Sequence, residues 1–406
     1  MYPRLLHNSL SQKNHGMSML LFGPRQTGKS TLIQNLLANK KNSLIFRLNE
    51  TQTYQELLKN PAFIFQSTQA SLARHPKVNL FIDEIQLMPA LLGDCQSLLD
   101  QNKDKLTIYL TGSSARKLRR DGSNLLPGRL IKKNLHALCF AEFMPIKESY
   151  LFPDMPQLCH SKTPHSLESL LIHGTLPGIL TSSTDFKTEI LQSYVSTYLQ
   201  EEIRMEALAR NLSQFTRFLE LAALESGNSP NYAKLSNETG IPASTIQNYF
   251  EILEDTLIIF RVPPFAHPGR KKTLSTPRYY FYDTGIRNAA ANLPLDSSLI
   301  KINLGTLFEN FIVIELIRRI DYLAPKSWKY SFWRTTSGAE VDFIIETPDE
   351  IIPIEIKAAT SPSKKHIRHL QTFIREYGCK RGYVVGQFSL PQKMTEEITA
   401  IPWWMV

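Results

Sequence analysis

The sequence predicts an α/β protein in three parts, and three observations support that fold class. In residues 1–150, short apolar runs alternate with stretches of helical periodicity, which predicts a parallel sheet covered by helices on both faces. The middle of the chain carries mostly helical patterns, followed by two short strand patterns. From residue 296 onward, a strong helix precedes three strand patterns, a second helix and another strand, which predicts a smaller α/β domain.

Composition narrows the class of protein. Of the 406 residues, 42% are hydrophobic and 20% are charged, which excludes an intrinsically disordered chain. No apolar run reaches the roughly 18 residues of a membrane span, and residues 1–16 lack the apolar core of a signal peptide. The four cysteines are scattered without metal-ligand spacing, which favours a reducing compartment. We therefore expect a cytoplasmic protein that does not bind membranes.

The net charge of +9 is unevenly distributed. Residues 1–150 contain 20 basic and 10 acidic side chains, whereas residues 151–406 contain 26 basic and 27 acidic ones. A basic first domain favours an anionic partner, such as a nucleotide or a nucleic acid. A solubilising surface is the alternative interpretation.

Within the first domain, assigned to residues 1–150, three apolar runs predict buried parallel strands. They cover Met17–Phe22, Val78–Ile82 and Leu106–Leu110. The first run is followed at once by Gly23, and a helical pattern covers Ser30–Leu37.

The segment between this strand and helix matches the phosphate-binding loop G-x-x-x-x-G-K-[ST]. Its glycines allow backbone N–H groups to face phosphate oxygens, and the following helix directs its positive end at the same charge. Lys29 is expected to reach the β- and γ-phosphates of ATP, and Ser30 to bind Mg²⁺. The predicted nucleotide-binding residues are Gly23, Pro24, Arg25, Gln26, Thr27, Gly28, Lys29, Ser30, Thr31 and Asp83.

A second element supports the nucleotide site, because the strand before Asp83 and Glu84 ends in these two acids. Asp83 is placed to bind Mg²⁺ through water, and Glu84 to orient and polarise the attacking water. This pair favours hydrolysis over transfer of the phosphate to a metabolite. Surface acids capping an ordinary strand are the alternative.

Two further features of the first domain are candidates for a role in ATP hydrolysis. The strand over Leu106–Leu110 ends in Thr111–Ser114, whose side chains are candidates to sense the γ-phosphate or the attacking water. Arg129 is a candidate catalytic residue that stabilises transition-state charge, in its own chain or in a neighbouring copy of an ATP-dependent homo-oligomer. A surface arginine is the alternative. The nearby basic residues Arg116, Lys117, Arg119 and Arg120 are expected to form a solvated face, with contact to a DNA backbone as the alternative.

The middle of the chain is divided into a helical connector, residues 151–200, and a winged-helix-like domain, residues 201–295. A helix is predicted over Ser193–Leu224, and a helix–turn–helix pattern over Lys234–Leu257, with Gly240 in the turn. Basic residues 270–272 lie between two predicted strands and would form a wing. The second helix is not basic, so contact with a protein competes with contact with DNA.

The last part, residues 296–406, contains a carboxylate–lysine pattern. Asp342 lies on one predicted strand, while Glu355 and Lys357 lie two residues apart on the next, which places them on the same face. These carboxylates are candidate metal ligands, and Lys357 can stabilise developing charge. Glu309 is a further candidate ligand, and Gln371 a supporting residue. Exposed surface charges are the alternative interpretation.

Taken in order, these motifs resemble the AAA-type ATPases of bacteria and archaea that are fused to the domain of unknown function 4143. The resemblance covers nearly the whole chain. It rests on Gly23–Ser30, Leu80–Gln86, Leu110–Ser114, His173–Gly178, Tyr280–Gly285 with Asp283, Gly305–Asn310, Glu340–Phe343 and Glu355–Lys357. It implies an ATP-binding domain, a winged-helix element and a restriction-endonuclease-like domain with the PD-(D/E)xK motif.

The leading hypothesis is an Mg²⁺-dependent ATPase whose nucleotide cycle regulates a nuclease-like domain that acts on DNA. One alternative is a nucleotide-operated switch whose C-terminal region only binds a protein partner. Another is an ATPase tethered to DNA without nuclease activity.

Overall fold

The computed structural model describes residues 2–12, 17–113, 126–146, 148–159, 165–203, 211–266 and 276–406. The chain forms two compact units. The N-terminal unit comprises residues 4–136 and 255–257, and the C-terminal unit comprises residues 1–3, 137–254 and 258–406. The basic residues 116–120 and 270–272 and the side chain of Ser114 lie outside the described residues. Among the described helices, none combines the length and the apolar character needed to cross a membrane.

The N-terminal unit is built on a five-stranded parallel sheet with the strand order β2-β3-β4-β1-β5. The strands are β1 (Ser18–Phe22), β2 (Ser43–Arg47), β3 (Val78–Asp83), β4 (Leu106–Gly112) and β5 (Leu130–Asn134). The predicted strands β1, β3 and β4 are confirmed and are almost fully buried, as their apolar runs require. The order places β4 between β1 and β3, so the ends of all three strands meet at one edge.

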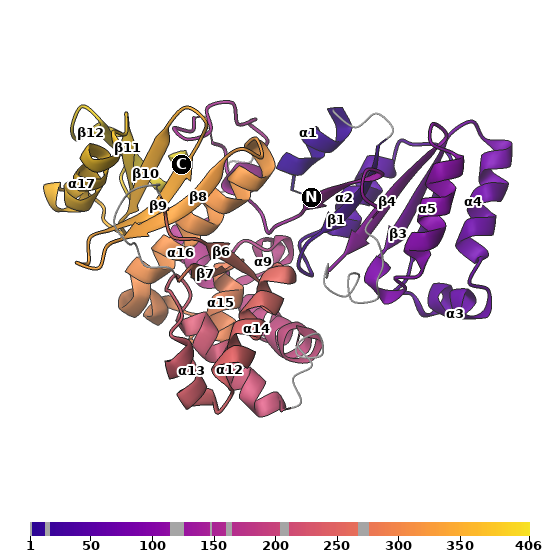
Figure 1. Cartoon of the computed structure of the whole chain (residues 1–406), viewed down its shortest axis with the longest axis horizontal. Coiled ribbons are helices and arrows are strands. Elements are labelled where there is room, and N and C mark those ends of the chain that lie inside the picture. Colours follow the sequence, from indigo (N-terminus) through magenta and orange to yellow (C-terminus); the bar gives the residue numbers. More distant parts are fainter. Residues whose placement is uncertain are drawn as a thin grey trace. The chain divides into compact units, whose positions relative to one another are not determined.

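Helices cover this sheet, and Figure 1 shows α2 and α5 on opposite sides of β4. Leu32 and Ile33 of α2 and Leu98 of α5 are completely or almost completely buried, which explains their helical spacing in the sequence. The helical elements of this unit are α1 (Leu5–Gln12), α2 (Lys29–Leu37), α3 (Thr51–Lys59), α4 (Phe63–Arg74), the short 3₁₀ helix η1 (Ile85–Leu87) and α5 (Leu91–Gln101).

The C-terminal unit begins with a helical region. Its first elements are α7 (Phe140–Phe143), α8 (Leu167–His173), α9 (Pro177–Thr181), α10 (Thr184–Ser193) and the π-helix η2 (Tyr194–Ile203). The helical pattern predicted over Ser193–Leu224 is present as this π-helix and as α12 (Leu212–Leu224), and residues 204–210 lie outside the described residues. Apolar periodicity does not distinguish hydrogen bonds that span four residues from those that span five, so the sequence pattern hides the change.

The predicted helix, turn and helix are present as α13 (Tyr232–Thr239) and α14 (Ala243–Asp255). Gly240 ends α13 in the left-handed conformation, with φ 70°, which a glycine adopts without strain. An antiparallel hairpin of β6 (Ile259–Val262) and β7 (Arg278–Phe281) follows. After it come α15 (Thr284–Ala290) and the long helix α16 (Ser297–Leu323).

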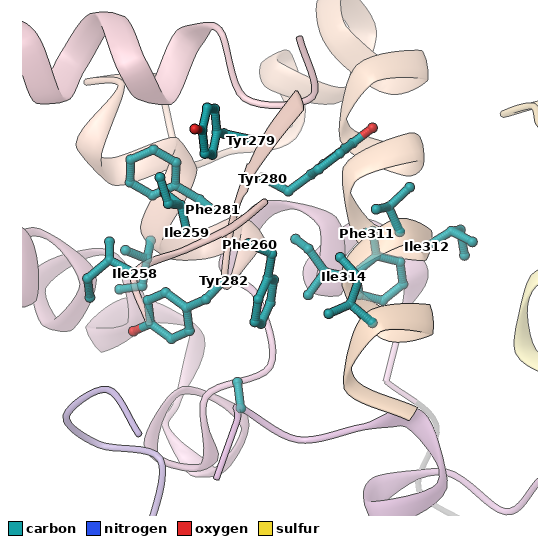
Figure 2. Close-up of a cluster of buried hydrophobic side chains, with 14 of the residues drawn as sticks. Ile258, Ile259, Phe260, Tyr279, Tyr280, Phe281, Tyr282, Phe311, Ile312 and Ile314 are labelled. Atoms are coloured by element: carbon teal, nitrogen blue, oxygen red, sulfur yellow. The ribbon is translucent and has the colours of Figure 1, made fainter. Parts of the chain in front are cut away.

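The hairpin packs on α16 and joins the middle of the chain to its C-terminal sheet. Figure 2 shows Tyr280 pointing from β7 toward α16, whereas Tyr279 and Phe281 point away from that helix. Tyr280, Phe281 and Ile312 are almost fully buried in one continuous apolar core. This packing places the β7 side chains next to residues that are distant in the sequence.

The C-terminal sheet has six strands in the order β12-β13-β11-β10-β9-β8 and is mixed. Strands β10, β11 and β13 are parallel, whereas β8 and β9 form an antiparallel hairpin beside β10. The elements are β8 (Lys329–Arg334), β9 (Glu340–Glu346), β10 (Ile351–Ile356), η3 (Lys364–Ile367), α17 (Arg368–Tyr377), β11 (Gly382–Gly386), β12 (Gln392–Lys393), β13 (Ile398–Pro402) and η4 (Trp403–Met405).

A buried carboxylate, Asp283, joins two parts of the helical region. It accepts hydrogen bonds from the N–H groups of Gly285 and Ile286 at the start of α15, and from the N–H of Thr175 at 2.8 Å. Gly174 has φ 75°, and a Cβ atom there would lie 1.9 Å from Asp283 Oδ1. The segments His173–Gly178 and Tyr280–Gly285 therefore meet at a structural joint, which we call the Asp283 joint.

Candidate functional sites

The phosphate-binding loop follows β1 and closes tightly on the sheet. A Cβ atom at Gly23 would lie 2.2 Å from the carbonyl oxygen of Leu135, so only glycine fits there. Gly28 has φ 92°, and its left-handed conformation turns the chain into α2. Thr27 is fully buried, and its hydroxyl donates to the carbonyl of Pro24 at 2.9 Å. Thr27 therefore stabilises the loop from within.

Lys29 is the buried cation of this loop, with 5% of its surface exposed. Its Nζ donates to the carbonyl oxygens of Gly23 and Pro24 at 2.9 and 3.0 Å. Burial lowers the pKa of Lys29, while the negative charges of Glu84 and Asp83 act in the opposite direction. The lysine is thus held at the loop by carbonyl groups that an anionic ligand can replace.

Asp83, at the end of β3, meets the loop directly. Ser30 Oγ donates to Asp83 Oδ1 at 3.0 Å, and the hydroxyl of Thr111 donates to the same oxygen. The Thr111 hydroxyl also accepts from the N–H of Glu84 at 3.2 Å. Because β4 lies between β1 and β3, the end of β4 supports both acids of the site.

Glu84 has φ 60°, which is unusual for a residue other than glycine and turns its side chain out of the strand. The side-chain amide of Gln86 donates to Glu84 Oε2 and, at 2.8 Å, to Ser113 Oγ. Thr111 lies on β4, and Ser113 is the first residue after this strand. Their hydroxyl groups contact Asp83 and Gln86, respectively.

A cavity of about 390 Å³ lies at this site. Its lining residues are Arg25, Gln26, Gly28, Lys29, Ser30, Thr31, Asn49, Glu84, Gln86 and Leu87. The cavity therefore brings together the loop cation, the hydroxyl of Ser30 and the carboxylate of Glu84.

Arg129 is not among the described residues that line this cavity. Its guanidinium forms two hydrogen bonds with the carboxylate of Asp100, at 2.6 and 2.9 Å. The pairing lowers the pKa of Asp100, because the Arg129 guanidinium hydrogen-bonds its ionised form. In this structure Arg129 is engaged on the surface of its own unit.

The second candidate site lies on β9 and β10 in the C-terminal unit. Lys357 Nζ lies 2.7 Å from Glu355 Oε1 and 3.3 Å from Asp342 Oδ2. Asp342 Oδ2 also accepts from the backbone N–H of Ile356 at 2.7 Å. Asp342 and Glu355 are 4% and 6% exposed, so the alternative of two exposed surface charges does not apply to these carboxylates.

The negative charge of Asp342 acts on Glu309 of α16. The carboxylate of Glu309 is held in place by residues from β7. The phenol of Tyr280 donates to Glu309 Oε1 at 3.0 Å, and Arg278 Nη1 lies 3.8 Å from the same oxygen. Arg278 also forms an ion pair with Glu340 on β9. Gln371 lies on α17, and no hydrogen bond among the described residues joins it to these carboxylates. We call Glu309, Asp342, Glu355 and Lys357 the carboxylate cluster.

Comparison with protein families divides the chain into three matched segments. Residues 15–144 match an AAA domain, residues 164–297 match a domain of unknown function (DUF8612), and residues 304–406 match a domain of unknown function (DUF4143). The chain thus carries an AAA domain and a DUF4143 domain. Arg278 and Tyr280 fall in the DUF8612 segment, so the carboxylate cluster receives side chains from outside the DUF4143 domain.

Similar proteins occur in bacteria and archaea. An uncharacterised protein of Mycobacterium tuberculosis is 25% identical over 391 residues, which is 95% of this chain and 79% of that protein. An uncharacterised Haemophilus influenzae protein is 23% identical, covering 89% of this chain and 87% of its own length. An uncharacterised protein of Methanocaldococcus jannaschii is 25% identical, covering 80% and 71%.

Solved structures show only distant similarity. C. elegans PCH-2 aligns with a TM-score of 0.25 and 17% identity, over 63% of this chain and 65% of that one. A signal transduction ATPase with numerous domains from Pyrococcus horikoshii, which has a tetratricopeptide repeat sensor, aligns with a TM-score of 0.28 and 13% identity, over 80% and 48%. The chain thus covers less than two thirds of either structure, and such low scores support no inference.

In the DUF4143 domain, burial acts on the pKa values of Glu309, Glu355 and Lys357. Burial first, and then the charge of Asp342, raise the pKa values of Glu355 and Glu309. Burial alone would lower the pKa of Lys357, but the charges of Asp342 and Glu355 outweigh it and raise this pKa. Positive charge beside Glu355 therefore favours its ionised form, and Lys357 supplies such a charge.

The oxygen atoms of the carboxylate cluster meet only some of the requirements of a metal site. Glu355 Oε2 is buried and receives no hydrogen bond from any described residue, which leaves a free oxygen ligand beside Asp342. However, no three His, Cys, Asp or Glu side chains among the described residues are already grouped as a metal site requires. Glu309 in particular accepts a hydrogen bond from the phenol of Tyr280.

Sequence reasoning missed four residues of these sites. Gln86 follows two residues after Glu84, but its link to Ser113 depends on the strand order. Arg4 donates to the carbonyl of Thr27 at 2.6 Å and so holds the phosphate-binding loop. Arg278 and Tyr280 are separated from the carboxylates by at least 29 residues, and no local pattern identifies them.

Proposed function

We propose that the AAA domain binds ATP with Mg²⁺ and hydrolyses it. One observation carries this proposal: Ser30 of the loop and Asp83 of β3 meet at 3.0 Å beside a cavity lined by Lys29 and Glu84. Hydroxyl and carboxylate oxygens are the ligands that Mg²⁺ prefers, so the residues present fit this ion.

In this proposal each residue has a separate task. Lys29 exchanges its bonds to the Gly23 and Pro24 carbonyls for bonds to the terminal phosphates. The N–H groups of the loop and of the start of α2 bind the phosphate oxygens. Bound Mg²⁺ would neutralise phosphate charge, and Glu84 would orient the attacking water.

The proposal is tested with Lys29→Ala and Glu84→Gln. Lys29→Ala should abolish nucleotide binding, measured with a fluorescent ATP analogue, because the phosphates lose their buried cation. Glu84→Gln should retain nucleotide affinity but lose turnover, measured by phosphate release. Equal turnover in the wild type and Glu84→Gln would refute the role of Glu84.

As a second function, we propose that the DUF4143 domain cleaves DNA in a metal-dependent reaction and that the ATP cycle regulates it. The contact of Lys357 with both Asp342 and Glu355 favours this function. Asp342 and Glu355 would hold the metal, Glu309 would add a ligand, and Lys357 would stabilise charge on the phosphate.

Cleavage of plasmid, linear and single-stranded DNA with Mg²⁺ or Mn²⁺ tests this second function. Asp342→Ala and Lys357→Ala should both abolish cleavage while leaving ATP affinity unchanged. Equal cleavage by the wild type and Lys357→Ala would assign the activity to another source. DNA binding that weakens with salt, without cleavage, would support an ATPase tethered to DNA.

Absence of both cleavage and DNA binding would favour the protein-binding switch.

For Arg129, a role in a neighbouring copy is testable by size-exclusion chromatography with and without ATP. If Arg129 acts on a neighbour, ATP should shift the wild type to a larger assembly, and Arg129→Ala should have reduced turnover.

A further inference from the structure

We propose that Arg4 is a positioning residue of nucleotide binding. Its guanidinium fixes the direction of the peptide bond between Thr27 and Gly28, so that the N–H of Gly28 faces the phosphates. This inference rests on the proposed binding of ATP and deepens it, because it gives a task to a residue outside the phosphate-binding motif. Arg4 acts through the loop and not on the nucleotide itself.

The guanidinium of Arg4 makes two directed contacts inside the protein. Arg4 is buried, although it carries a charge. Its Nη1 donates to the carbonyl oxygen of Thr27 at 2.6 Å, and its Nη2 donates to the carbonyl oxygen of His136 at 2.7 Å. The guanidinium is planar and always charged, so bonds to two separate segments define its orientation. Arg4 thus holds the Thr27 carbonyl from a fixed direction.

The direction of the Thr27 carbonyl sets the direction of the next N–H. The peptide bond between Thr27 and Gly28 is trans, and in a trans peptide the C=O and the N–H point to opposite sides. The carbonyl points to Arg4, so the N–H of Gly28 points away from it. Gly28 lines the nucleotide cavity, whereas Arg4 is not among the described residues that line it.

The backbone at the start of α2 has the form of an anion-binding loop. Gly28 has φ 92° and ψ 26°, in the left-handed region, and Lys29 begins the right-handed helix. Such a change of hand makes successive backbone N–H groups converge on one concave surface that binds anions. Here these groups belong to Gly28, Lys29 and Ser30, which all line the cavity. The convergence depends on the present direction of the Thr27–Gly28 peptide bond.

Gly28 does not hold its own N–H in place. If the Thr27–Gly28 peptide bond turned over, Gly28 would move to a negative φ, and glycine adopts both signs of φ with similar ease. The turned peptide would present the Thr27 carbonyl to the phosphates in place of the N–H, and the partial negative charge of this oxygen would repel them. The bond from Arg4 opposes this turn, because turning would leave a buried guanidinium without the Thr27 acceptor.

Arg4→Met tests this role, because methionine is also long and unbranched but has no hydrogen-bond donor. We expect the affinities for ATP and ADP to fall by the same factor, about 10- to 100-fold, because the loop N–H groups bind the α- and β-phosphates that both nucleotides carry. Turnover at saturating ATP should change less than about threefold, since this contact is made equally before and during hydrolysis. Titration calorimetry measures the affinities and the fraction of protein that is competent to bind.

Two further variants accompany this measurement. Arg4→Lys retains a charged donor that can bond one of the two carbonyls, so its affinity should lie between those of the wild type and Arg4→Met. Arg74→Met is the matched control, because Arg74 is exposed at the end of α4 and is not among the described residues that line the cavity. It should leave both affinities unchanged.

Wild-type affinity in Arg4→Met, with the wild type binding both nucleotides, would overturn this inference alone. A smaller competent fraction with unchanged affinity would also overturn it, because Arg4 would then only support folding. A loss confined to ATP would overturn it as well, since the shared phosphates would then be bound normally. A wild-type chain that binds neither nucleotide would refute the proposed ATP binding, and this inference with it.

Discussion

The Asp283 joint and the carboxylate cluster both bury acids in the C-terminal unit, yet they differ in how those acids are satisfied. Asp283 accepts three backbone hydrogen bonds and lies 3.7 Å from Arg318. Glu355 contacts Lys357 on one oxygen, and its other oxygen has no partner among the described residues. Burial raises the pKa of both acids, so the direction of the pKa shift does not separate them.

The hydrogen bonds that each acid accepts distinguish the two sites. An acid whose oxygens accept hydrogen bonds from the backbone of two segments holds those segments together. An acid with an unengaged oxygen next to other carboxylates retains the capacity to bind an external cation. We therefore infer a structural role for the Asp283 joint and propose a chemical role for the carboxylate cluster, and the following predictions test this distinction.

The largest effect is expected for Asp283→Ala. The change leaves the N–H groups of Thr175, Gly285 and Ile286 and the charge of Arg318 without their buried partner. We expect the free energy of unfolding to fall by about 3–5 kcal/mol, measured by urea denaturation. Asp349→Ala, at an exposed position, is the control and should change it by less than about 0.5 kcal/mol. A similar small effect at Asp283 would refute its structural role.

A second substitution tests the same joint without removing an acid. In Gly174→Ala the new methyl group would overlap Asp283, and the residue has φ 75°. We expect a loss of about 2–4 kcal/mol, from this overlap and from backbone strain. Gly338→Ala is the comparison, because it has φ 88° but meets no atom within 4 Å. Its loss, caused by strain alone, should be smaller, and equal losses would contradict the close contact at Asp283.

Glu355 of the carboxylate cluster should respond to pH in the opposite direction from an acid whose pKa is lowered on folding. Because burial and Asp342 raise the pKa of Glu355, the folded state retains a proton that the unfolded state loses. Stability should therefore fall as the pH rises from about 4, the unfolded value for Glu, toward the raised folded value. In metal-free buffer, Glu355→Gln should remove a part of this fall on the order of 1–3 kcal/mol. Parallel pH profiles of both proteins would contradict the raised pKa.

The smallest effect on stability is expected for Tyr280→Phe. Only the hydroxyl that donates to Glu309 is lost, while the ring remains in its apolar core. We expect a loss of about 1 kcal/mol or less in unfolding free energy, measured by thermal denaturation. If Glu309 is a metal ligand, metal-dependent DNA cleavage should change more than stability does. A loss of several kcal/mol would instead place Tyr280 with the structural residues.

The sequence predicted those features whose signal is local. The phosphate-binding loop and the acids Asp83 and Glu84 follow apolar runs, and the three strands β1, β3 and β4 have the continuous apolar pattern of buried parallel strands. The spacing of Glu355 and Lys357 likewise predicted their shared face, and both contact each other in the structure.

Other features were missed because their signal is not local. Strands β2 and β5 lie at the edges of the sheet and are only partly buried, so their sequences mix apolar and polar residues. The partners of Glu309 and Glu84 depend on which strands and helices are neighbours, which the sequence pattern alone does not specify.

The contact of β7 with α16 limits where the chain can be cut into fragments that preserve the carboxylate cluster. Tyr280 and Arg278 supply side chains to Glu309 and Glu340, and Tyr280 and Phe281 share an apolar core with Ile312 of α16. A recombinant fragment that begins at residue 304, where the DUF4143 match starts, would expose this face of α16 to solvent. A shuffled domain carrying only that segment would likewise lose Tyr280 and Arg278. An expression fragment intended to preserve the cluster should therefore begin near residue 137, where the compact unit resumes.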